Sequence, residues 1–146
     1  MLFNRYKTPG LAHFSYLIGD GGTAVVIDPK RDIDEYIEDA VYAGYRITQI
    51  FETHRNEDYL IGSTVLAERT GAEIWHADGE LDYRYGERAE DGQAWQIGGR
   101  KLKAVSTPGH TPGSMSYILY DPAEVPWMVF TGDTLFAGDT GRVDLL

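Results

Sequence analysis

Residues 106–114 read STPGHTPGS, and this stretch places a histidine in a tight turn between two runs of strand-forming residues. The runs are Leu102 to Ser106 before it and Ser114 to Tyr120 after it. Proline and glycine on both sides of His110 favour a turn over a continuous strand. Loops that follow strand ends are where layered α/β folds place their ligands, so His110 is a candidate functional residue.

Two other segments place polar residues directly after a predicted strand in the same way. Phe51 to Tyr59, FETHRNEDY, presents His54, and Val129 to Thr134, VFTGDT, presents Asp133. Two imidazoles and one carboxylate from three such loops can converge as the facial triad suited to non-haem Fe(II), which leaves positions open for O₂ and substrate. Water in an open position could equally become a hydroxide nucleophile. A lone histidine after a strand is usually a loop or capping residue, but the joint occurrence of these segments favours a metal site.

The remaining segments indicate strands that alternate with helices early in the chain and a run of strands later, which is typical of a layered α/β or α+β domain. The expected strands are 14–18, 23–29, 47–51, 72–75, 102–106, 114–120 and 127–131, and the expected helices are 33–43, capped by Asp32 or Asp34, and 59–69. A Gly/Asp turn joins the first two strands into a hairpin. The polar stretch 78–93 is expected to be a partly helical surface excursion, and 137–142 to be loop.

The chain has 146 residues, with 13 Lys and Arg against 23 Asp and Glu, a formal charge of −10 and no cysteine. This length predicts one domain, residues 1–146. The acidic balance argues against a nucleic-acid partner. The absence of cysteine excludes a disulfide scaffold, a thiolate nucleophile and a cysteine-ligated zinc or iron–sulfur site, and it fits a reducing cytoplasm. The N-terminus has no signal-peptide pattern and no apolar run could span a membrane, so we expect a cytoplasmic protein without a membrane partner.

The sequence resembles the metallo-β-lactamase superfamily from about residue 12 to the end of the chain. The segments that carry the resemblance are Tyr16 to Ile18, Val26 to Pro29, Thr53-His54, Thr107 to Ser114 and Thr131 to Phe136. The resemblance implies an αββα sandwich. Within the superfamily, the closing GRVDL of residues 141–145 is similar to the Gly-Arg-x-Asp-Phe segment of persulfide dioxygenases, including rhodanese-fused relatives. Glyoxalase II-like thioester hydrolases are the next nearest resemblance.

The first metal-binding motif departs from the superfamily pattern. The usual motif is His-x-His-x-Asp-His, and the matching residues here are His54, Asn56, Asp58 and Tyr59. Two of the three histidines are replaced, which disfavours a dinuclear zinc site. His54, together with His110 and Asp133 from the other two loops, matches the positions that persulfide dioxygenases use to bind a single iron. The resemblance therefore implies one Fe(II) per chain as cofactor, with zinc as the alternative.

Four other residues receive roles near this site from the resemblance. Asp58 is expected to orient a ligand or a bound water, or else to cap the helix that starts near Tyr59. Asn56 and Tyr59 could bind a metal-bound water or the substrate, or simply pack. Arg142 is similar to the arginine of the Gly-Arg-x-Asp-Phe segment, so we expect it to bind a substrate carboxylate through two hydrogen bonds. The alternative is a surface ion pair.

Two other histidines and the glycines of the motifs have simpler expected roles. His13 and His76 match no ligand motif. His13 could line the cleft, although a surface or capping role is favoured. Gly109, Gly113 and Gly132 are expected to serve backbone turns.

The resemblance and the surviving ligand set together predict a persulfide dioxygenase that oxidises a glutathione persulfide-type substrate with O₂ to sulfite. The alternatives are a metal-dependent thioester hydrolase and a catalytically inactive scaffold that binds a partner or a persulfide. Members of the superfamily usually continue beyond the Gly-Asp motif, so the chain is expected to be the N-terminal part of the full fold. An exposed sheet edge would then need cover, and we expect a homodimer or a partner chain.

Overall fold

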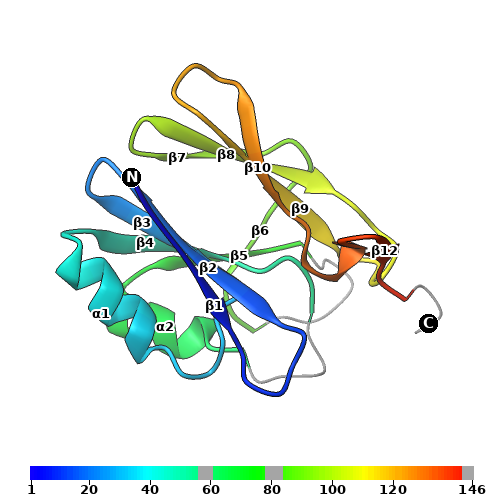
Figure 1. The fold of residues 1–146 in the computed structure, drawn as a ribbon, viewed down its shortest axis with the longest axis horizontal. Helices are drawn as coiled ribbons and strands as arrows, with labels where there is room; N and C mark the ends of the chain where they lie inside the picture. Colours follow the sequence, from blue (N-terminus) through cyan, green and yellow to red (C-terminus); the bar gives the residue numbers. More distant parts are fainter. Residues whose placement is uncertain (56–60, 78–83, 143–146) are drawn as a thin grey trace.

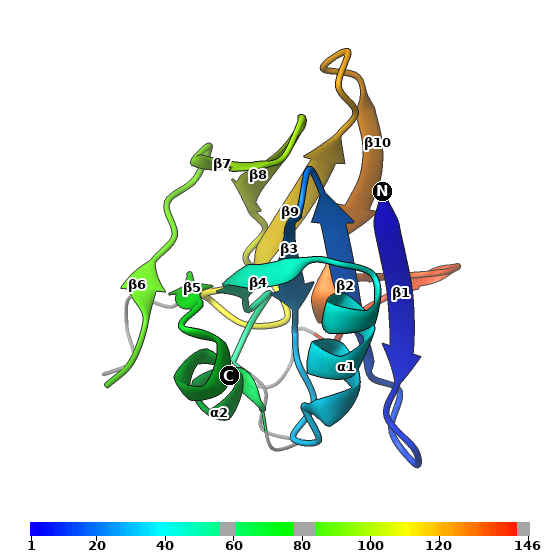
Figure 2. The ribbon, with the colours of Figure 1, turned by 90° about the vertical axis from the view of Figure 1, so that its left-hand side faces the viewer.

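The computed structural model describes residues 1–55, 61–77 and 84–142 as two β-sheets, two α-helices and a short hairpin. The first sheet has the order β1-β2-β3-β4-β5-β6 and the second β10-β9-β8-β7. Both helices lie on one face of the first sheet, and the second sheet covers the other face (Figures 1 and 2). The described residues thus supply one helical layer and two sheets of the predicted layered α/β sandwich, and the fold class is confirmed.

The elements of the first sheet and its helices are β1 Leu2–Lys7, β2 Phe14–Asp20, β3 Thr23–Ile27, α1 Asp34–Tyr42, β4 Arg46–Phe51, α2 Ser63–Thr70, β5 Glu73–His76 and β6 Glu87–Arg88. The remaining elements are β7 Ala94–Ile97, β8 Arg100–Ser106, β9 Met115–Tyr120, β10 Pro126–Phe130, the 3₁₀ turn η1 Gly132–Thr134, β11 Leu135–Phe136 and β12 Asp139–Thr140. Neither α-helix has the length or the hydropathy to cross a membrane within the described part of the chain.

The first sheet forms as its sequence pattern predicts. β2 and β3 pair antiparallel as the expected hairpin, whereas β3, β4 and β5 run parallel. Parallel neighbours need a crossover connection, and α1 and α2 provide it. Side chains alternate along β2, so Leu17 packs with the helices and Ile18 with the second sheet. The molecule consequently has two apolar layers, one on each face of the first sheet.

Some expected details of the helices are wrong. The N-cap of α1 is Ile33, without a side-chain hydrogen bond, rather than Asp32 or Asp34. Asp34 instead forms an exposed ion pair with Arg69 of α2. α2 begins at Ser63 with Gly62 as its N-cap, rather than near Tyr59 as expected, and Asp58 itself lies outside the described residues. The described part of the polar stretch, 84–93, contains the short strand β6 and no helix.

Besides β6, four described strands have no counterpart among the predicted ones. β1 is an edge strand that pairs only with β2, and its polar residues weaken the sequence signal. β7 lies just beyond the polar stretch and pairs with β8. β11 and β12 form a two-residue hairpin in a region whose second half the sequence predicts to be loop, and in Figure 1 this hairpin lies beside the β8–β9 turn. Leu135 and Phe136 of this hairpin line a cleft at one end of the sandwich.

Candidate metal centre

Three loops bring His54, His110 and Asp133 together at one end of the sandwich. His54 follows β4, His110 lies in the β8–β9 turn, and Asp133 lies in η1 after β10. The Nε2 atoms of His54 and His110 lie 3.8 and 3.7 Å from Oδ2 of Asp133. One potential ligand atom from each residue falls within 4.8 Å of the other two. Among the described residues, this is the one group of three His, Asp or Glu side chains close enough to share an ion.

Hydrogen bonds to Thr53 and Asp28 set the tautomer of His54. The backbone N–H and the hydroxyl of Thr53 donate to the two carboxylate oxygens of Asp28, each over 2.7 Å. Because that hydroxyl proton is committed to Asp28, the Thr53 oxygen accepts from Nδ1–H of His54 at 2.8 Å. The lone pair of His54 therefore lies on Nε2, the atom that faces Asp133, as metal binding requires.

A backbone carbonyl sets the tautomer of His110 in the same way. Its Nδ1 lies 3.0 Å from the carbonyl oxygen of Arg142, which can only accept a hydrogen bond. Nδ1 must then carry the proton, and the Nε2 lone pair of His110 points towards Asp133. Both imidazoles are thus held with their metal-binding nitrogens unprotonated and on the same side.

Asp28 belongs to the candidate site through its hydrogen bonds to Thr53, and the sequence assigned it no role. Its carboxyl is buried, and burial raises its pKa to about 7, although the two hydrogen bonds from Thr53 act in the opposite direction. Its backbone has φ 49°, an unusual left-handed conformation that Asp tolerates better than most residues. The available signal was an acidic residue directly after the apolar run Ala24 to Ile27 of β3.

Close backbone packing holds the loops around the three side chains. Gly132 has φ 51°, and a Cβ there would overlap the Thr53 side chain and lie 3.0 Å from Nδ1 of His54. A Cβ at Gly141 would overlap the carbonyl oxygen of Asp133 and lie 3.3 Å from Cβ of His110. The predicted turn role of Gly132 is confirmed, and the structure adds a steric reason for both glycines.

A cleft of about 430 Å³ opens beside His54 and Asp133. Its walls are mainly aromatic and aliphatic. The lining residues include Arg5, His13, Phe14, Tyr16, Leu135 and Phe136. His13 lines this cleft instead of taking the favoured surface role, and its Nδ1 lies 2.7 Å from the Thr8 hydroxyl. Burial lowers the pKa of His13 to about 4, so its ring is neutral at pH 7.

The profile of the Metallo-beta-lactamase superfamily matches residues 8–146. The chain belongs to the metallo-β-lactamase superfamily. A hydroxyacylglutathione hydrolase from Acidiphilium cryptum is 33% identical, over 97% of this chain and 57% of that protein. The mitochondrial persulfide dioxygenase ETHE1 of Bos taurus is 30% identical, over 99% of this chain and 56% of that protein. The chain thus spans little more than half the length of these curated relatives.

Solved structures of superfamily members agree with this assignment. A metallo-beta-lactamase from Staphylococcus aureus subsp. aureus COL superposes with a TM-score of 0.91 at 37% identity, covering 99% of this chain and 47% of that one. ETHE1 from Myxococcus xanthus superposes with a TM-score of 0.88 at 30% identity, covering 99% of this chain and 63% of that one. The relatives named here thus include enzymes of two reaction classes, hydrolases and a dioxygenase.

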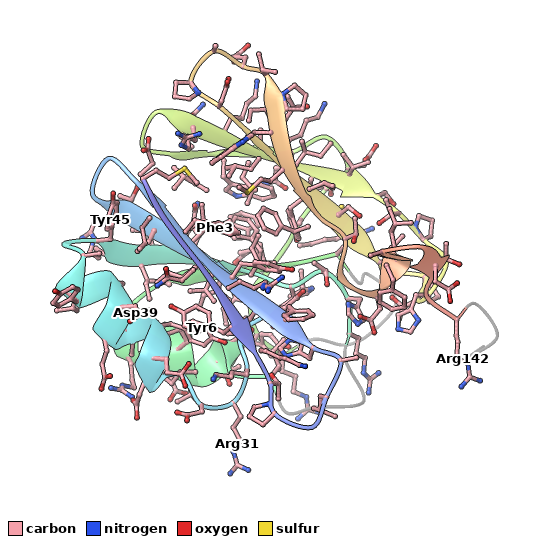
Figure 3. The ribbon with its side chains drawn as sticks, in the orientation of Figure 1. Phe3, Tyr6, Arg31, Asp39, Tyr45 and Arg142 are labelled. Carbon is pink, nitrogen blue, oxygen red and sulfur yellow. The ribbon has the colours of Figure 1, made fainter. Side chains whose placement is uncertain are left out.

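The other predicted residues of this superfamily site fall in different places. Asn56, Asp58 and Tyr59 lie outside the described residues. The Arg142 side chain is exposed and points away from the body of the protein (Figure 3), while its carbonyl oxygen bonds His110. His76 is buried and is not one of the three clustered side chains, and its Nε2 lies 2.9 Å from the carbonyl oxygen of Tyr85.

Proposed function

We propose that this chain forms the iron-binding part of a persulfide dioxygenase, with His54, His110 and Asp133 as the protein ligands of one Fe(II). The observation that carries the proposal is the ligand set itself: two imidazoles with unprotonated Nε2 atoms and one carboxylate meet at a cleft. Two histidines and one carboxylate with open positions are the usual protein ligands of non-haem Fe(II) oxygenases.

The spacing of the three side chains suits one ion. Ligand atoms that share an ion through bonds of about 2.0–2.2 Å lie roughly 3–3.5 Å apart. The two Nε2–Oδ2 distances, 3.8 and 3.7 Å, exceed this by a few tenths of an ångström. Small side-chain rotations would bring the three atoms to bonding distance without moving the strands that hold them.

The proposed reaction oxidises the outer sulfur of a persulfide to sulfite. Persulfide, O₂ and water give the free thiol and sulfurous acid, so O₂ is reduced and water supplies the third oxygen. Bound Fe(II) would supply neighbouring open positions for the sulfur and O₂. Thr53 and the Arg142 carbonyl keep the imidazoles in one orientation, and the apolar cleft wall excludes water from the reacting sulfur. Because the chain has no cysteine, the sulfur stays on the substrate.

A hydrolase is the second candidate function. Its support is the 33% identity to the hydroxyacylglutathione hydrolase of Acidiphilium cryptum, and a 30% identical relative from Bacillus velezensis is named as a probable zinc-dependent hydrolase. The same three side chains are acceptable zinc ligands, and zinc would activate a water for attack on a thioester. A binding scaffold without turnover is the third candidate.

Metal analysis and two substrate assays separate the three candidates. Protein purified anaerobically should contain about one iron per chain and give the EPR signal of an iron–nitric oxide adduct. The iron-loaded protein should consume O₂ with glutathione persulfide, and His110→Ala should abolish this uptake. Zinc with hydrolysis of a hydroxyacylglutathione thioester would establish the hydrolase instead, and the absence of tightly bound metal would establish the scaffold.

We also propose that a second copy or a partner chain covers the edge strand β10. Among the described strands β10 pairs only with β9, and its Trp127 and Val129 side chains are 50% and 55% exposed. Unpaired strand edges with apolar side chains favour association. Light scattering on the purified chain should give the mass of a dimer, and a monomer that binds no partner would refute this proposal.

A further inference from the structure

The cleft beside the candidate metal centre has one permanent positive charge among its described lining residues. That charge belongs to Arg5 of β1. His13 is neutral at pH 7, and Asp28 and Asp133 are acids. In a chain of net charge −10, a carboxylate that enters the cleft meets one cationic side chain among the described lining residues, in addition to any metal ion bound at the centre.

The register of β1 directs Arg5 to the cleft side of the first sheet. Asn4 and Tyr6 both donate hydrogen bonds to the carboxylate of Asp39 on α1, so these neighbours face the helices. Figure 3 shows Tyr6 and Asp39 on this side of the sheet. Because strand side chains alternate, Arg5 lies on the opposite face, where its Cα partner is Tyr16 of β2. The guanidinium carbon of Arg5 lies 4.8 Å from the centre of the Phe14 ring.

Ring packing positions the Arg5 guanidinium without using its hydrogen-bond donors. Within the described part of the chain, Arg5 enters none of the side-chain hydrogen bonds or ion pairs, and its guanidinium lies over the Phe14 ring. A cation–π contact leaves the planar donor edge open for bidentate contact with a carboxylate. An arginine that forms no ion pair with any described acid is notable in a protein with 23 acidic residues.

We propose that Arg5 determines substrate specificity by binding a carboxylate of the substrate at the β1 wall of the cleft. The substrate class is then an anionic thiol derivative whose sulfur group reaches His54 and Asp133 while its apolar part contacts Phe14 and Tyr16. This inference rests on the proposed function only in placing the reacting sulfur at the metal centre. It assigns to Arg5 the carboxylate that the sequence assigned to Arg142, whose side chain is not part of the described cleft lining.

A binding experiment tests Arg5 independently of turnover. Calorimetry would compare S-methylglutathione, which carries two carboxylates, with its diethyl ester, which carries none. Arg5→Gln should weaken binding of the diacid about tenfold, the size expected for losing one charge-assisted contact, and change binding of the diester less than about twofold. Arg5→Lys should retain part of the preference for the diacid, because lysine keeps the positive charge but lacks the planar guanidinium edge that contacts a carboxylate through two hydrogen bonds.

Arg31→Gln is the matched control, because Arg31 is exposed and points into solvent away from the cleft (Figure 3). It should bind both ligands as the wild type does. Equal weakening of both ligands in Arg5→Gln, an unchanged diacid affinity, or a wild type that binds neither ligand would each overturn the proposal.

Kinetics then separate this inference from the proposed function. With glutathione persulfide, Arg5→Gln should raise KM about tenfold and leave kcat within about twofold, as expected for lost uniform binding. A wild type that prefers the diacid in calorimetry but consumes no O₂ would refute the dioxygenase while leaving the role of Arg5 standing.

Discussion

Replacement of Asp28 by asparagine should weaken metal binding by reversing the protons along a hydrogen-bonded chain. Asparagine tolerates the left-handed backbone at φ 49°, so the loops after β3 and β4 should keep their shape. The oxygen of the new side-chain amide must accept from the Thr53 backbone N–H, which turns the amide NH₂ towards the Thr53 hydroxyl. The hydroxyl then accepts from this NH₂ and donates its own proton to Nδ1 of His54. The His54 proton moves to Nε2, the atom that must bind the metal.

The size of this effect follows from the two short contacts involved, 2.7 Å from Asp28 to the hydroxyl and 2.8 Å from the hydroxyl to Nδ1. Loss of a partner behind a metal-binding histidine lowers metal affinity by about 10–100-fold, or about 1.4–2.7 kcal/mol. The assay is competition with a chelator for Fe(II) and for Zn²⁺, combined with ¹⁵N NMR of the His54 ring. Thr53→Ser is the control, because it keeps the hydroxyl and should keep the affinity. Wild-type affinity in Asp28→Asn, with Nε2 still unprotonated, would refute the reasoning.

Three further predictions concern packing, pH and metal binding. Gly132→Ala should destabilise the chain by about 1–3 kcal/mol more than Gly138→Ala in urea unfolding, because both residues have positive φ but only the Cβ at 132 meets a neighbour within 4 Å; equal losses would contradict the steric argument. Burial raises the pKa of the 1% exposed Glu52 from 4.5 to about 7, so its contribution to stability is highest below pH 4.5 and declines as pH rises to 7. The stability of wild type relative to Glu52→Gln should therefore fall by up to about 3 kcal/mol across this window in the metal-free protein, and a pH-independent difference would refute the burial argument. Fe(II) or Zn²⁺ at about 100 times its Kd should stabilise the wild type by about 2.7 kcal/mol in thermal unfolding, and His110→Ala should lose this gain; an undiminished gain would remove His110 from the ligand set.

Turn chemistry and strand patterns carried much of the fold prediction. The β2–β3 hairpin, the crossover helices and the three strands β8, β9 and β10 of the second sheet appear within a few residues of their expected bounds. β1 and β11–β12 escaped prediction for a physical reason. β1 is a half-exposed edge strand with polar side chains, and β11–β12 is only two residues long in each strand, so tertiary contacts rather than local propensity define them.

By itself the sequence determined which chemistry is available: two histidines and an aspartate after strand ends, a superfamily-like turn at 106–114, and no thiol. Only the tertiary structure decided how that chemistry is arranged. Which ring nitrogen of His54 carries the proton depends on Asp28, which accepts hydrogen bonds from Thr53, 25 residues away in the sequence. The proton position on His110 depends on the carbonyl of Arg142, 32 residues away. Arg5 acquires its place in the cleft only because β1 pairs with β2 in one register. Such relations join segments far apart in the chain, and folding brings them within hydrogen-bonding distance.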